Sequence, residues 1–125
     1  MPSLTLSEIS YYRSQLADYP DAITALDEII TCDGDLEDAA INLAIAVGQL
    51  PDRTDWLEGL AKRYRVEICQ EMMQKELSQG NMIPVINHLI ESKISPTILI
   101  IPVVFYVMKI GVDDFCSSLN FQIKT

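Results

Sequence analysis

The sequence predicts an all-α protein, an irregular bundle of about five to seven helices with one long central helix. Three observations predict this class. Apolar residues recur at steps of three and four along most of the chain, which is the period of a helix with one buried face. Prolines and glycines interrupt these stretches at intervals typical of helix ends. The composition of the 125 residues, 49% hydrophobic and 22% charged, is globular, so we expect residues 1–125 to form one helical domain.

Local signals predict three helices in the first half of the chain, over residues 6–18, 20–32 and 36–49. Thr5 and Glu8 have the spacing of a capping box, in which each side chain bonds a free backbone N–H of the first turn. Pro20 suits the first position of the second helix, and Gly34 ends that helix. Asp35 is a good N-cap for the third helix, because its carboxylate accepts hydrogen bonds from free N–H groups.

The longest periodic stretch, residues 55–79, predicts the central helix of the bundle. Its apolar stripe consists of Leu57, Leu60, Ala61, Tyr64, Ile68, Met72 and Leu77. Gly80 and Asn81 form a stop signal after it. A shorter helix is expected over residues 84–93.

The stretch 96–110 is also predicted to be a helix, although its composition points two ways. Its β-branched residues favour strands, and Pro102 costs a helix interior about 3 kcal/mol. Two short strands, over residues 97–101 and 103–108, are therefore the alternative. We favour a kinked, buried helix because no stretch upstream has the pattern of a strand partner. A last short helix over residues 114–119, followed by an extended arm, completes the expected elements.

Residues 98–108 form a run of eleven apolar residues, counting the proline. A helix that spans a membrane needs about 20 such residues, so we expect no membrane segment. The run is expected to be buried, either in the core or in an interface with a partner. Val104 and Tyr106 lie in its second half and would serve either role.

The three cysteines, Cys32, Cys69 and Cys116, are far apart and form no C-x-x-C pair. An odd number of widely spaced cysteines argues against a secreted disulfide scaffold. We therefore expect free thiols that pack as small hydrophobic groups in a reducing cytoplasm. The first residues have neither a basic start nor a continuous apolar run, so no signal peptide is expected.

The formal net charge of −9 is unevenly distributed along the chain. Residues 1–61 hold twelve acids and two bases, whereas residues 62–125 hold six acids and seven bases. Negative charge argues against binding to nucleic acid, whose phosphates would repel the chain. The asymmetry predicts a basic protein partner for the first half, or a homodimer in which unlike halves meet. In the simpler alternative, the carboxylates only keep the surface soluble.

Motifs for catalysis are missing from the sequence. His88 is the only histidine, so a zinc site built on several histidines is excluded. A catalytic triad would have to use His88, and the sequence has no recognisable nucleophile motif to accompany it. The sequence therefore predicts no catalytic residue, no metal ligand and no cofactor. A metal-dependent hydrolase is the alternative function, because hard cations prefer oxygen ligands. Its carboxylates would be carried by helices, at Asp27, Glu28, Glu67 and Glu71.

We therefore expect a noncatalytic protein–protein interaction or regulatory module with an acidic N-terminal half. The expected interaction residues are Trp56, Lys62, Arg65, Val104 and Tyr106. Trp56 is the sole tryptophan, a residue type that often anchors interfaces. Lys62 and Arg65 belong to the only basic cluster and are three residues apart, close to one helix face. Val104 and Tyr106 represent the apolar run.

Overall fold

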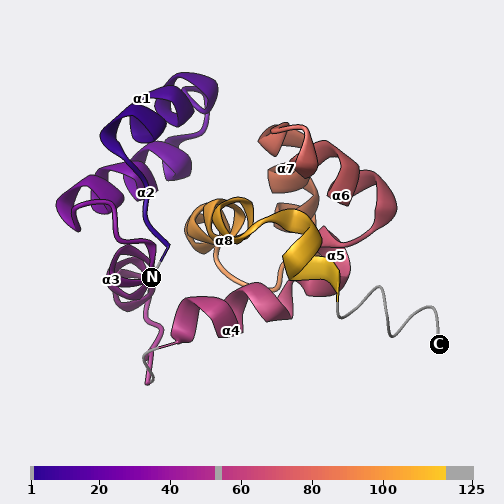
Figure 1. The fold of residues 1–125 in the computed structure, drawn as a ribbon. Helices are drawn as coiled ribbons and strands as arrows, with labels where there is room; N and C mark the ends of the chain where they lie inside the picture. Colours follow the sequence, from indigo (N-terminus) through magenta and orange to yellow (C-terminus); the bar gives the residue numbers. More distant parts are fainter. Residues whose placement is uncertain (1, 53–54, 118–125) are drawn as a thin grey trace.

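The computed structural model describes residues 2–52 and 55–117, and this part of the chain is all-α, as predicted (Figure 1). The helices are α1 (Leu6–Gln15), α2 (Pro20–Thr31), α3 (Leu36–Ala46), α4 (Trp56–Arg63), α5 (Arg65–Ile68), α6 (Glu71–Ser78), α7 (Met82–Ser92) and α8 (Thr97–Ile110). A further helical segment over residues 112–117 is called the C-terminal helix here. The nine helices of the described residues exceed the expected five to seven. No helix within these residues has the length and apolar character needed to cross a membrane.

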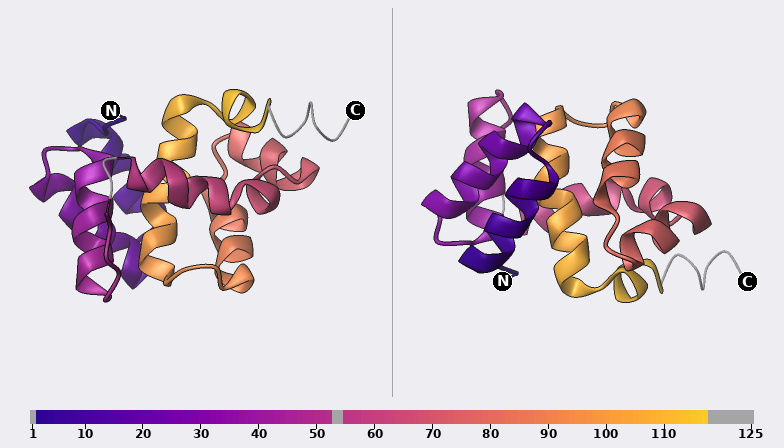
Figure 2. Two further views of the ribbon diagram at one scale, coloured as in Figure 1. Left: turned by 90° about the horizontal axis from the view of Figure 1, so that it is seen from below. Right: turned by 90° about the horizontal axis from the view of Figure 1, so that it is seen from above.

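Helix α8 is the centre of the fold. It contacts α2, α3, α4 and α7, and Figure 2 shows it between the α1–α3 side and the α6–α7 side of the molecule. Every residue from Leu99 to Val107 is buried. The prediction of a buried helix over this stretch is confirmed, and the alternative of two strands is wrong. Burial on all sides outweighs the backbone hydrogen bond that Pro102 cannot make.

The predicted long helix over residues 55–79 is wrong, because the chain turns twice within it. Tyr64 separates α4 from α5, and Gln70, in an extended conformation with ψ of 141°, separates α5 from α6. Tyr64 is buried, and its hydroxyl lies 2.6 Å from the Ser95 hydroxyl, so a partner outside the stretch holds the first turn. After the second turn, α6 directs a different face toward the core. Met72, which belongs to the predicted apolar stripe, is therefore 70% exposed. The longest helix is instead α8, with 14 residues.

The helices of the first half begin where the sequence predicts. The capping box of α1 is present: Thr5 N–H donates to Glu8 Oε1 at 2.9 Å, and Glu8 N–H donates to Thr5 Oγ1 at 3.1 Å. Asp35 caps α3 by accepting a hydrogen bond from a backbone N–H at 2.9 Å. Gly34 has a φ of +87°, and a Cβ there would collide with the carbonyl oxygen of Leu4. Only glycine fits this turn, so the stop signal has a structural reason.

Two predicted helices, over residues 84–93 and 114–119, begin two residues earlier than expected. Helix α7 begins at Met82, two residues before the predicted start at Pro84. The C-terminal helix begins at Val112, directly after Gly111, which ends α8 with a φ of +99°. The expected arm beyond residue 119 lies outside the described residues.

Candidate functional site

Two of the five expected interaction residues lie in the core. Val104 is fully buried and Tyr106 is 7% exposed. Both belong to α8 at the centre of the bundle. The apolar run therefore packs inside this chain and is not available to a partner of the folded protein.

The two basic residues lie on different helices and have different neighbours. Lys62 of α4 is exposed, and its Nζ lies 4.0 Å from Glu58 Oε1, one helical turn away. Arg65 belongs to α5, where its guanidinium lies over the ring of Phe115 at 5.0 Å from the centroid. Arg65 Nε is buried and has no hydrogen-bond partner among the described residues. The two side chains therefore contact different partners, Glu58 and Phe115.

Trp56 begins α4 and packs partly buried against the core. It borders an open hollow of about 290 Å³. The other residues around this hollow are Gln49, Asp52, Gly59, Leu60 and Arg63. The hollow lies where α3 is connected to α4, so the sequence-predicted anchor lies next to a connection rather than in the middle of a helix face.

Three large apolar side chains are exposed in the part of the sequence that precedes Trp56. Ile45 is 58% exposed, Val47 is 39% exposed and Leu50 is 90% exposed, all within six residues at the end of α3. We call Ile45, Val47, Leu50 and Trp56 the connection surface. Ile45 and Val47 lie within the predicted helix over residues 36–49, and the sequence analysis did not identify them as exposed. The available signal was that the apolar residues of this helix occupy more faces than one neighbour can cover.

The carboxylates named for a hydrolase do not converge. Asp27 pairs with Arg13, and Glu28 accepts a hydrogen bond from the Asn42 side chain at 3.0 Å. Glu67 Oε2 lies 2.6 Å from His88 Nε2 between α5 and α7, and Glu71 is exposed on α6. Within residues 2–52 and 55–117, no group of three or more histidine, cysteine or acidic side chains is arranged to hold a metal ion. The geometry gives the hydrolase alternative no support.

Glu37, in the first turn of α3, is a buried carboxylate. It is 5% exposed and accepts a hydrogen bond at 2.8 Å from the backbone N–H of Leu57, in the first turn of α4. Burial raises the pKa of Glu37, and the charges of neighbouring aspartates add to this effect, while the bond from Leu57 opposes it. The side chain joins α3 to α4 and has no access to a substrate.

The expectation of three free cysteines is wrong for two of them. Cys69 and Cys116 form a disulfide, with their Cα atoms 5.7 Å apart. The sequence could not predict this pairing, because the two cysteines are 47 residues apart and only the fold brings them together. Cys32 remains a thiol, and burial together with the Glu28 and Asp38 carboxylates raises its pKa to about 11. None of the three cysteines is therefore an activated nucleophile.

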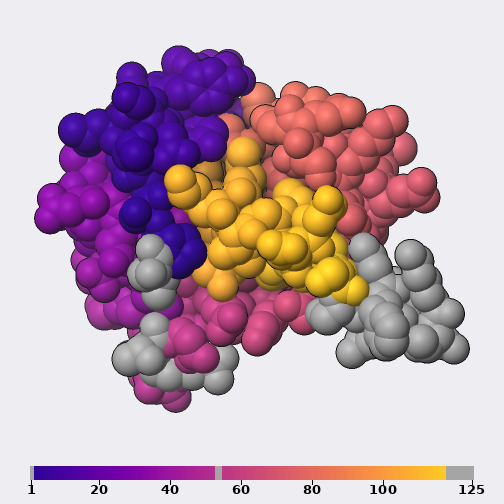
Figure 3. Space-filling view, viewed as in Figure 1, coloured from indigo at the N-terminus to yellow at the C-terminus, as the bar shows by residue number. Residues whose placement is uncertain are grey.

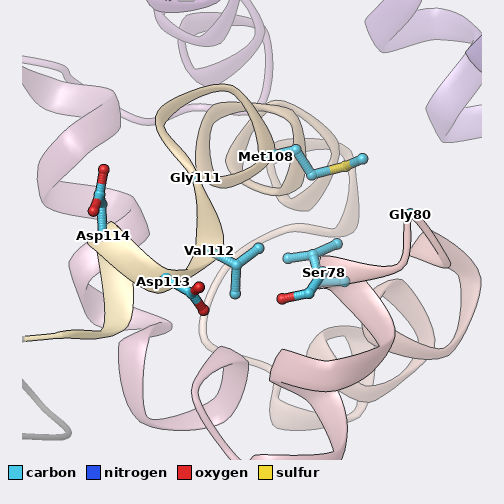
Figure 4. Close-up of a pocket in the computed structure, with 8 residues that line it drawn as sticks. Ser78, Gly80, Met108, Gly111, Val112, Asp113 and Asp114 are labelled. Carbon is cyan, nitrogen blue, oxygen red and sulfur yellow. The ribbon is translucent and has the colours of Figure 1, made fainter.

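The largest of the hollows described here, of about 430 Å³, lies between the end of α6, the end of α8 and the C-terminal helix (Figure 4). Its lining residues are Leu77, Ser78, Gly80, Met108, Gly111, Val112, Asp113 and Asp114. Figure 4 shows Val112 and Asp113 on the side that faces Ser78, whereas Asp114 points away from it. We call this space the C-terminal groove. Its described lining offers the Ser78 hydroxyl and the Asp113 and Asp114 carboxylates, and it includes neither a histidine nor a lysine.

Comparison with models of known protein families, with curated proteins and with solved structures finds no match to this chain. The function is therefore inferred from the chain's own surfaces.

Proposed function

We propose that this chain is a noncatalytic module that binds a basic, amphipathic segment of a protein partner through the connection surface. One observation carries the proposal: large apolar side chains are exposed at Ile45, Val47 and Leu50, in the segment of the sequence that precedes the partly buried Trp56. Apolar side chains gathered at the surface are typical of docking sites, and a tryptophan in a half-open hollow is typical of an interface anchor.

The charge of the surrounding half supports a basic partner. Residues 1–61 carry twelve acids and two bases, and the aspartates at Asp21, Asp27, Asp33 and Asp38 are exposed on α2, on α3 and between them. Such a surface attracts a cationic segment over long distances and repels a second acidic copy. A homodimer is the second arrangement, and it would place the connection surface against the less acidic half of the partner copy.

The cytoplasm stays the proposed compartment, although its original ground, three free thiols, now holds for Cys32 alone. There, cellular thiols would control the Cys69–Cys116 disulfide. Alkylation of free thiols in intact cells, followed by mass spectrometry, measures which of the three cysteines are reduced.

The test compares the double variant Ile45→Asp, Leu50→Asp with the natural chain. A model amphipathic helix of leucine and lysine serves as the probe, and its leucine and glutamate counterpart serves as the charge control. We expect the double variant to bind the basic helix at least about tenfold more weakly, which corresponds to about 1.4 kcal/mol. Binding of the natural chain should weaken with salt, and the acidic helix should not bind.

A matched control comes from apolar residues exposed elsewhere. Val66 and Met72 are 64% and 70% exposed on α5 and α6. The double variant Val66→Asp, Met72→Asp adds the same charge and should bind the basic helix as the natural chain does, apart from the small long-range effect of charge. Equal binding by both double variants would show that the connection surface is not the docking site. Sedimentation equilibrium of the natural chain separates the homodimer from the binary complex.

A further inference from the structure

We infer that the Cys69–Cys116 disulfide is a redox-controlled latch, whose reduction by a dithiol releases the C-terminal helix while α1–α8 stay folded. The inference concerns regulation and stands independently of the connection surface. It rests on where the two cysteines lie and on what else holds the C-terminal helix.

The latch joins one short segment to one face of α5. Cys69 is the residue that ends α5, and Arg65 lies four residues before it, one helical turn away. These two residues engage Cys116 and Phe115, which are neighbours on the C-terminal helix. The C-terminal helix lies beside α5 in Figure 1 and at the molecular surface in Figure 3. A covalent bond and a cation–π contact therefore dock the same two residues.

Most of the packing of the fold lies away from this bond. Helix α8 packs against α2, α3, α4 and α7, and the disulfide joins none of these five helices to another. The C-terminal helix has only six described residues, a length at which an isolated helix is unstable in water. Among its described residues, Val112, Phe115 and Cys116 are buried in the core, and Arg65 lies over the Phe115 ring. Loss of the covalent bond is therefore expected to loosen this segment first.

The reaction is thiol–disulfide exchange. A thiolate of the dithiol attacks the sulfur of Cys69. This residue is 8% exposed, whereas Cys116 is fully buried. The Cys116 sulfur leaves with the bonding electron pair and takes a proton. The second thiol of the reductant then attacks the mixed disulfide and releases Cys69 as a thiol, so two electrons pass from the dithiol to the protein. Local opening of the terminal segment gives the reductant its access.

The third cysteine is held out of this exchange. Cys32 lies on the opposite half of the chain, at the end of α2, and the raised pKa of its thiol leaves little thiolate at neutral pH. It is therefore a poor attacking group, and the disulfide is protected from rearrangement. The latch also controls the C-terminal groove, because Val112, Asp113 and Asp114 form one of its walls. Reduction is expected to remove that wall.

The experiment adds dithiothreitol to the folded, oxidised full chain without denaturant. Hydrogen exchange is followed by mass spectrometry, and free thiols are counted by alkylation. We expect two additional alkylated cysteines, about tenfold faster exchange in residues 112–117, and unchanged exchange in α2, α3 and α8. Three outcomes would overturn the latch: a disulfide that resists reduction until denaturant is added, unfolding of the whole chain on reduction, or unchanged exchange in residues 112–117.

Variants supply a second, independent measurement. The double variant Cys69→Ser, Cys116→Ser should show the fast exchange of residues 112–117 without any reductant. Cys32→Ser keeps the disulfide and should respond to dithiothreitol as the natural chain does. If the double variant fails to fold while the reduced natural chain stays folded, the measurement on the natural chain decides the question.

Discussion

The two halves of this molecule are held together over very different distances in the sequence. The side-chain hydrogen bonds described between residues of the α1–α3 region span 14 residues or fewer, as in the capping box and the pair of Arg13 and Asp27, although Glu8 also contacts Lys109. From α4 onward the described contacts include one over 21 residues, between Glu67 and His88, and one over 47, between the two bonded cysteines. A helix end that is set by residues close in sequence can be predicted from a short motif. A helix end that is set by a residue far away in sequence cannot, because the contact exists only in the folded chain.

Helix α8 connects the halves, because it packs against helices of both. We expect Val104→Asp to have the largest effect of all the substitutions proposed, since it buries an unpaired carboxylate at a fully buried position. The expected loss of unfolding free energy is at least about 4 kcal/mol, enough to unfold a marginal protein. Urea denaturation followed by circular dichroism measures this loss. Val66→Asp, at an exposed position, should change stability by less than about 0.5 kcal/mol.

The outcome also tests whether the halves are one cooperative structure. If α1–α3 kept native helical exchange protection in Val104→Asp while the second half unfolded, the two halves would be independent, and α8 would not unite them.

Glu37 lies at the border between the halves, where α3 leads to α4. Glu37→Ala would leave the buried N–H of Leu57 without an acceptor, and we expect a loss of about 1–3 kcal/mol. Glu37→Gln keeps an oxygen acceptor and should lose less. Thermal unfolding of both variants measures the difference. Equal losses would mean that the acceptor oxygen is not what stabilises the junction.

The same residue gives the stability a definite dependence on pH. Because burial raises the pKa of Glu37 in the folded state above its ordinary value of 4.5, the folded chain holds this proton more tightly than the unfolded chain. The sign follows from linkage: stability falls as pH rises from the unfolded pKa through the folded one. The stability of Glu37→Gln relative to the natural chain should therefore increase over that range. A difference that is constant with pH would contradict the raised pKa.

The contrast between the halves explains what the sequence could predict about the fold. Thr5, Glu8 and Asp35 cap helices within three residues, so their roles were visible in the pattern. The turns at Tyr64 and Gln70 interrupt a stretch whose periodicity alone indicates one helix. The first turn is held by a contact with a hydroxyl 31 residues away, and the second lies next to Cys69, whose disulfide partner is 47 residues away. Such partners have no local signature, so the broken helix could not be predicted.

The candidate site shows the same limit. Trp56 was identified as an anchor because tryptophan is rare and large, and these are properties of the residue itself. The exposure of Ile45 and Leu50 is a property of their surroundings, since it depends on whether another helix covers them. Val104 is just as apolar in sequence, but it is fully buried in α8, the helix that packs against four others. Residue type alone therefore could not separate the docking surface from the core.

Tyr64→Phe sharpens the comparison within the second half. It removes the hydroxyl that lies 2.6 Å from the Ser95 hydroxyl and keeps the buried ring, so we expect a loss of about 1 kcal/mol. Chemical denaturation measures the loss, and a double-mutant cycle with Ser95→Ala isolates the coupling between the two hydroxyls. Tyr11→Phe, at an exposed tyrosine, is the matched control and should be neutral. Additive losses in the cycle would show that this pair does not hold the turn between α4 and α5.

The smallest expected effect lies at a polar contact that joins α1 to α8. Lys109 Nζ lies 3.1 Å from both carboxylate oxygens of Glu8, and both side chains are about one-third exposed, so Glu8→Gln should cost only about 0.5 kcal/mol at neutral pH. The bond from the Thr5 backbone, followed by Lys109, lowers the pKa of Glu8 below 4.5, against the opposing effect of burial. Because the pKa of Glu8 is lower in the folded chain than in the unfolded chain, its charge stabilises the folded state at pH values above the unfolded pKa. This stabilisation is lost as the pH falls through the folded pKa. The difference between Glu8→Gln and the natural chain should therefore close in acid, opposite in direction to Glu37→Gln. A difference that persisted unchanged in acid would show that the charge of Glu8 does not contribute to joining the two halves.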